Sequence, residues 1–183
     1  MTEQLRDIGR RLSDLRSIME IAPDEFCLKT GVTPEELDAY ERGDRDFSFS
    51  FLYNAAHILG VDVMDLMSGD SPRLSSCSLV RNGQGYRVDR RAAYQYAHLA
   101  FTFRDKKAEP FLVTVEPKPE TPALHSHEGQ EFNYLLSGRM RFFIDSLVYD
   151  LGPGDSLYFN ANLPHAMQAL GDEPARFLAV VMG

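Results

Sequence analysis

The sequence around residue 130 reads His125-Ser-His-Glu-Gly-Gln-Glu-Phe-Asn-Tyr-Leu-Leu-Ser-Gly138. On a β-strand, His125 and His127 would point to the same face, so both imidazoles could reach one ion. Gly129 allows the chain to turn, and the following strand would bring the Glu131 carboxylate back over the same point. We therefore interpret this segment as half of a metal site.

A further histidine ends the segment Leu151-Gly-Pro-Gly-Asp-Ser-Leu-Tyr-Phe-Asn-Ala-Asn-Leu-Pro-His165. His165 offers a fourth ligand, which would join His125, His127 and Glu131 around one divalent ion. Three imidazoles and one carboxylate suit iron, manganese, nickel or zinc, whereas calcium and magnesium prefer shells made of oxygen. The sequence thus predicts a divalent transition metal as cofactor.

The two segments together carry a known pattern. His-x-His-x3-Glu-x6-Gly, followed by Pro-Gly-Asp and then Pro-His, resembles the two motifs of the cupin superfamily, small β-barrels with a metal in the mouth. The first motif fits at every defining position. In the second, Ala169 stands where cupins often have an asparagine. The resemblance implies that the C-terminal part of the chain is a jelly-roll barrel.

Composition indicates a soluble globular protein with one large domain or two small ones. The chain has 183 residues, 44% of them hydrophobic, and no apolar run approaches the roughly 18 residues of a membrane span. The amphipathic start, residues 1–6, is unlike a signal or transit peptide, so we expect a cytoplasmic protein without a membrane partner. Cys27 and Cys77 are isolated and indicate neither a disulfide framework nor a zinc site.

Helical patterning covers the N-terminal third. Apolar residues recur at helical spacing in the first segment, at Leu5, Ile8, Leu12, Leu15 and Met19. Caps and glycines predict four more short helices, at residues 24–30, 34–42, 49–59 and 62–67. The third begins with Thr33 as N-cap, Pro34 in the first helical position and Glu36 completing a capping box.

These helices resemble the repressor-type helix-turn-helix domain of the xenobiotic-response-element (XRE) family. The resemblance covers Leu5 to Met67 and rests on Gly31-Val-Thr33 between the second and third helices and on Tyr40-Glu-Arg-Gly43, which closes the third. It implies that the third helix faces DNA, and the contacts that we predict are Lys29, Thr33, Glu35, Arg42 and Arg45.

Acidic residues are concentrated in this same part of the chain. The formal net charge is −8, and Met1 to Met67 holds seven Lys and Arg against fourteen Asp and Glu. Glu35, with Asp38 beside it, would meet the phosphate backbone with the wrong sign. We therefore expect weak binding of each monomer to operator DNA, and useful binding only by a dimer on two half-sites.

Linker composition follows from Ser68 to Cys77, and after it the apolar runs are short, aromatic and β-branched. Strands are expected at residues 94–103, 111–116, 131–136, 139–144, 147–151, 156–159, 165–170 and 177–182. The predicted fold is a two-domain α+β protein, with a five-helix helix-turn-helix bundle at 1–68, a linker at 69–78 and an all-β cupin barrel at 79–183.

Strand parity suggests which side chains line a pocket beside the metal. Asn133 shares a face with Glu131, and Tyr94 and Tyr96 share a face on the first long strand. We predict that a small, oxygen-rich effector contacts Tyr94, Tyr96 and Asn133. For the two tyrosines, packing in the barrel core with hydroxyls reaching the rim is an equal alternative.

Two classes of function fit this layout. In the first, a transcriptional regulator, the helical domain binds operator DNA as a homodimer or higher oligomer and the cupin domain senses a metabolite. In the second, the chain is a metalloenzyme whose helical domain serves assembly. Its layout also resembles the iron-dependent phosphonate epoxidase family, which joins a helix-turn-helix to a cupin and binds iron through two His and one Glu.

The epoxidase resemblance implies His127, Glu131 and His165 as iron ligands of a non-haem oxygenase. His125 would then be an extra ligand, closing a position that oxygen and substrate need. We therefore favour the regulator and keep the enzyme as the alternative.

Overall fold

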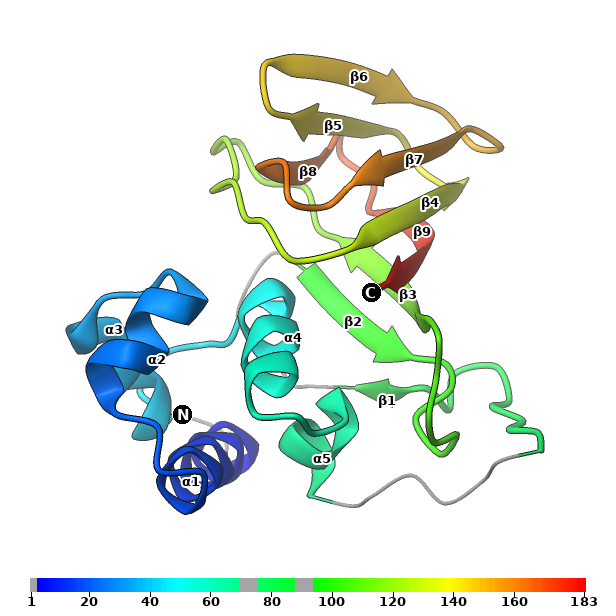
Figure 1. Ribbon diagram of the computed structural model, residues 1–183. Helices are drawn as coiled ribbons and strands as arrows, with labels where there is room; N and C mark the ends of the chain where they lie inside the picture. The colour runs from blue at the N-terminus through cyan, green and yellow to red at the C-terminus, as the bar shows by residue number, and fades with distance from the viewer. Residues whose placement is uncertain (1–2, 70–75, 88–93) are drawn as a thin grey trace. The chain divides into compact units, whose positions relative to one another are not determined.

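The computed structural model describes residues 3–69, 76–87 and 94–183 and shows two compact units, one helical and one built of strands (Figure 1). Helices precede strands along the chain, so the predicted α+β architecture is confirmed. Most of the predicted linker, residues 70–75, lies outside the described residues.

The helical unit contains the five predicted helices. They are α1 (Glu3–Ile18), α2 (Pro23–Thr30), α3 (Pro34–Glu41), α4 (Phe49–Ile58) and α5 (Val63–Ser68). Leu5, Ile8 and Leu12 of α1 are buried, whereas Met19 lies beyond the end of the helix and is exposed. No helix of the described residues is long and apolar enough to cross a membrane.

The turn between α2 and α3 forms as its residues predict. Gly31 adopts a φ of 73° and its N–H bonds to the Cys27 carbonyl, which ends α2. Thr33 accepts from the Glu36 N–H, and the Glu36 carboxylate accepts from the Thr33 N–H, so the capping box is confirmed. The half-buried pair of Arg16 and Glu41, with Nε and Oε1 2.7 Å apart, ties α1 to the end of α3.

The other unit is entirely antiparallel within the described residues. Its strands are β1 (Tyr86–Arg87), β2 (Tyr94–His98), β3 (Glu109–Val115), β4 (Gln130–Ser137), β5 (Met140–Ile144), β6 (Leu147–Leu151), β7 (Ser156–Asn160), β8 (His165–Ala169) and β9 (Ala175–Met182). They form a six-stranded sheet, ordered β1-β2-β3-β9-β4-β7, and a three-stranded sheet, ordered β6-β5-β8.

Two strands differ from the sequence prediction by more than the one or two residues at an end that separate the others from it. The predicted strand at 94–103 ends at His98, because the chain then turns: the Ala100 N–H donates to His98 Nδ1 and the Phe103 N–H to the Ala100 carbonyl. The two residues of β1 were not predicted, since so short a strand leaves no alternation to detect.

The core of this unit lies between the inner faces of the two sheets. Glu131, Asn133 and Leu135 alternate on the buried face of β4, as strand parity predicts. The rings of Phe142 on β5 and Phe159 on β7 are 5.2 Å apart and join one sheet to the other. The buried face of β4 therefore places polar side chains among apolar ones inside the unit.

Candidate metal centre

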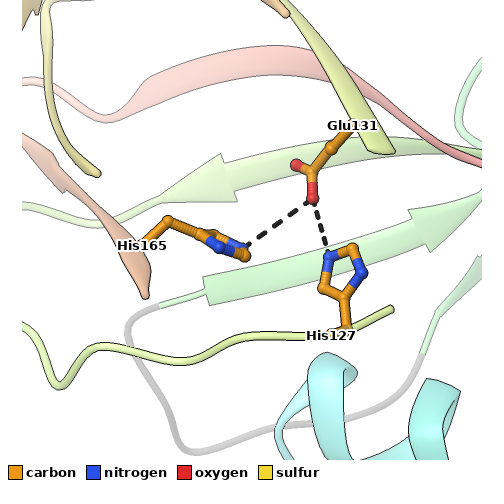
Figure 2. A group of neighbouring side chains, drawn as sticks. All are labelled: His127, Glu131 and His165. Atoms are coloured by element: carbon orange, nitrogen blue, oxygen red, sulfur yellow. Dashed lines mark hydrogen bonds and ion pairs between the residues drawn. The ribbon is translucent and has the colours of Figure 1, made fainter. Parts of the chain in front are cut away.

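Three side chains from separate segments converge inside the strand unit (Figure 2). His127 lies just before β4, Glu131 is the second residue of β4 and His165 begins β8. They are 3%, 5% and 5% exposed, and one ligand atom from each lies within 4.8 Å of the others. The sequence motif thus brings together three of its four predicted ligands.

Backbone hydrogen bonds position the segment that carries His127. The His127 N–H donates to the Ala161 carbonyl, and the Ala161 N–H donates to the Gly129 carbonyl, each at 3.0 Å. Gly129 has a φ of 94°, and a Cβ there would lie 2.0 Å from the carbonyl oxygen of Met182. This close turn places His127 and Glu131 opposite one another.

Neighbouring carbonyls fix the tautomer of both histidines. His127 Nδ1 lies 3.0 Å from the Glu128 carbonyl and His165 Nδ1 lies 2.9 Å from the Leu163 carbonyl. A carbonyl only accepts, so each Nδ1 carries a proton, and in the neutral form of each ring the lone pair is on Nε2. Burial lowers the pKa of His165, which favours the neutral ring at neutral pH.

The three converging atoms fit a cation. Glu131 Oε2 lies 3.0 Å from His127 Nε2 and 4.0 Å from His165 Nε2 (Figure 2). A proton on His127 would satisfy one of these approaches, but only a cation in their midst engages all three lone pairs. Two imidazole nitrogens and one carboxylate oxygen suit a divalent transition metal, and the carbonyls behind the rings are the outer contacts that hold such ligands in place.

His125 does not join this cluster. It pairs with His165 in an isolated β-bridge, with backbone N–O distances of 3.0 and 2.8 Å, and its side chain is exposed. The segment from His125 to His127 is not a regular strand, because the N–H of His127 bonds to Ala161 instead of continuing that bridge. The structure therefore shows three clustered ligands where the strand argument predicted four.

The predicted effector contacts fall into different environments. Asn133 is 1% exposed, and its Nδ2 donates to Glu131 Oε1 at 2.9 Å. The Tyr94 hydroxyl donates to the Met167 carbonyl and accepts from the Met167 N–H, so it links β2 to β8. The Tyr96 ring meets Phe111 edge-on at 6.1 Å. Of the three predicted effector contacts, Asn133 is thus the one for which the described residues show a hydrogen bond to a ligand of the candidate metal centre.

Each predicted basic DNA contact is paired with a carboxylate. Lys29 Nζ lies 2.7 Å from Glu25 Oε1 and Arg45 Nη1 lies 2.6 Å from Glu36 Oε1. Arg42 bridges two acids, Asp38 in the preceding turn of α3 and Asp44, the latter at 2.9 Å. Thr33 caps α3 and Glu35 is exposed. The charges of this face largely neutralise one another.

Comparison with known proteins identifies the strand unit. The cupin domain family matches residues 111–181, so this segment is a cupin domain. Oxalate decarboxylase OxdC of Bacillus subtilis (strain 168) is 42% identical over an alignment of 62 positions that covers 31% of this chain and 16% of that protein. The similarity therefore spans only a small part of the decarboxylase.

Solved structures match the whole layout. An HTH_3 family transcriptional regulator from Vibrio cholerae superimposes with a TM-score of 0.73 at 22% identity, covering 98% of this chain and 97% of that one. Hydroxypropylphosphonic acid epoxidase from S. wedmorenis gives a TM-score of 0.54 at 24% identity, covering 99% and 100%. At these identities the likeness shows the fold, a helix-turn-helix bundle followed by a cupin.

Proposed function

We propose that this chain is a DNA-binding regulator whose cupin domain holds a divalent transition metal through His127, Glu131 and His165 and senses a small molecule at that ion. The observation that carries the proposal is the buried convergence of two Nε2 lone pairs and a carboxylate oxygen. Three protein ligands leave coordination positions for an exogenous molecule.

The effector in this proposal is small and rich in oxygen, since a carboxylate or phosphonate would complete the shell of the ion. Asn133 bonds to Oε1 of Glu131, the oxygen that does not face the imidazoles, and in this proposal it also contacts the molecule on the ion. Tyr94 and Tyr96 contribute walls of the pocket, with the Tyr94 hydroxyl turned to the β8 backbone. Binding without turnover would make this site a sensor.

DNA binding would use the start of α3, where backbone N–H groups and the positive end of the helix dipole attract phosphate. The ion pairs of Lys29, Arg42 and Arg45 are solvent-exposed, and such pairs contribute only about 0–1 kcal/mol each. Phosphates can therefore compete for the three cations, but the carboxylates stay close by. We propose that a homodimer in the cytoplasm offsets this weakness by binding two half-sites.

Removing two of these carboxylates tests the DNA proposal. The double variant Glu35→Gln with Asp38→Asn is expected to strengthen binding to duplex DNA roughly fivefold or more at low salt, because it removes repulsion and releases Arg42 from Asp38. Fluorescence anisotropy with labelled duplexes at several salt concentrations measures the change.

Asp172→Asn with Glu173→Gln is the matched control, since it changes the charge equally at an exposed turn of the cupin domain. Its affinity is expected to stay near wild type. If both double variants bind equally, α3 does not face DNA. If no protein binds even at low salt, the helix-turn-helix serves assembly and the regulator proposal fails.

One observation favours the second candidate, a non-haem iron oxygenase. With His125 outside the cluster, the ligand set is two histidines and one glutamate, the set that leaves positions for oxygen and substrate. His125, the fourth ligand whose presence made an oxygenase less favoured in the sequence analysis, does not belong to the cluster formed by the described residues. The helix-turn-helix would then be an assembly module.

Oxygen uptake separates the two candidates. Protein loaded with Fe²⁺ under nitrogen is screened for small acids that raise its melting temperature, and each stabilising acid is then mixed with the protein and oxygen. A sensor is expected to release the acid unchanged and to consume no oxygen beyond the ligand-free control. Stoichiometric oxygen uptake with conversion of the acid would identify an oxygenase.

A further inference from the structure

Asn133 has one polar atom that the protein leaves unsatisfied. Its Oδ1 is buried and has no hydrogen-bond partner among the residues that the structure describes. The other end of the amide is anchored, because Nδ2 donates to Glu131 Oε1 at 2.9 Å. The amide cannot be reversed at no cost, since Glu131 only accepts and would then face an acceptor.

The orphan oxygen lies next to the candidate metal centre. Glu131 divides its two oxygens between Asn133, through Oε1, and the imidazoles, through Oε2. Across the sheet, Asn133 stands opposite Leu157 on β7 and Ala179 on β9, whose side chains carry no donor. A donor for Oδ1 would therefore come from a molecule held beside the ion.

We propose that Asn133 Oδ1 accepts a hydrogen bond from an O–H or N–H group of the small molecule bound at the ion. The pocket then selects molecules that present a donor next to their metal-binding group over molecules that present only acceptors there. This inference rests on the metal site of the proposed function. An acceptor placed against Oδ1 leaves a buried polar atom unpaired, which reduces affinity by a factor on the order of ten.

Lactate and pyruvate provide matched probes. They share a carboxylate and carbon skeleton, but lactate presents an alcohol O–H where pyruvate presents a ketone oxygen. Their dissociation constants are measured by titration calorimetry on the full chain loaded with Co²⁺, and the Co²⁺ absorption spectrum reports binding at the ion. The same two ligands are titrated with Co²⁺ in buffer, which gives their intrinsic preference for the ion.

The protein is expected to shift the preference towards lactate by about tenfold relative to Co²⁺ in buffer. In Asn133→Leu, which is close in size and lacks the acceptor, this shift is expected to disappear. A role of Asn133 limited to holding Glu131 would weaken both ligands by the same factor and leave their ratio unchanged. The ligand ratio thus separates the two roles, as a double-mutant cycle does.

A third probe covers the case in which Asn133→Leu fails to fold. 2-Methoxypropionate keeps the carboxylate and an ether oxygen but has no O–H, so wild-type protein is expected to bind it as poorly as pyruvate. Equal selectivity in protein and buffer overturns the inference, while the metal site stands. Failure of the wild type to bind Co²⁺ overturns the metal site itself, and this inference with it.

Discussion

Alanine in place of His127 is expected to lower the affinity of the cupin domain for divalent transition metals by at least about a hundredfold. Loss of an outer contact alone typically costs about 10–100-fold, and His127 supplies one of the three ligand atoms that cluster among the described residues. Its Nε2 already points at Glu131, 3.0 Å from Oε2, while the Glu128 carbonyl lies 3.0 Å from Nδ1 on the other side of the ring. Elemental analysis of protein purified without added metal, and Co²⁺ titration, measure the loss.

His125→Ala is the matched control, since it removes the other histidine of the same motif, two residues away and exposed. We expect it to keep metal affinity close to wild type. Equal losses of metal affinity in both variants would support the four-ligand shell that the motif predicts. They would mean that the His125 side chain turns inward when the ion binds. Full metal content in His127→Ala would overturn the assignment.

The sequence was informative about this site wherever the spacing of residues along the chain controls geometry. Parity along β4 correctly predicted that Glu131, Asn133 and Leu135 share the buried face. The same argument did not hold between His125 and His127, because those two residues do not lie on a regular strand. Alternation predicts side-chain direction only where backbone pairing is continuous.

Contacts between distant segments could not be read from residue types. The hydroxyl of Tyr94 bonds to the backbone of Met167, and any residue other than proline at 167 would offer the same N–H and carbonyl. The hydrogen bonds from the two histidines to the Glu128 and Leu163 carbonyls could not be predicted from the sequence either. Such partners are set by how the strands pack, and only the folded chain reveals them.

Charge around α3, the helix that we propose to face DNA, could likewise be predicted only in part. The acidic surplus was evident from the sequence, and the pair of Asp38 and Arg42 follows from helical spacing. Arg45 and Glu36 are nine residues apart, and their pairing depends on the turn after α3. The acidic charge around α3 could thus be predicted from the sequence, whereas the carboxylate that pairs with Arg45 could not.

Alanine at Gly129 is expected to destabilise the cupin domain by about 3 kcal/mol or more, the combined cost of a left-handed backbone and of overpacking. Its φ of 94° disfavours any side chain, and its Cβ would lie 2.0 Å from the Met182 carbonyl oxygen. Since Met182 pairs with Gln130 at the start of β4, relief of this overlap would shift the segment between His127 and Glu131. We therefore expect metal affinity to fall together with stability.

Gly154→Ala is the matched control, and the difference between the two variants gives the destabilisation caused by steric overlap at Gly129. Gly154 has the same φ of 94°, but no heavy atom of the described residues lies within 4 Å of the position of its Cβ. That variant should carry only the backbone strain, about 1–2 kcal/mol, and should retain its metal. Urea unfolding followed by near-ultraviolet circular dichroism, with metal content measured in parallel, compares the two. Equal losses of stability, with full metal content in both variants, would contradict this prediction. They would show that β9 moves at Met182 without cost, and that a glycine is needed at 129 only because of its positive φ.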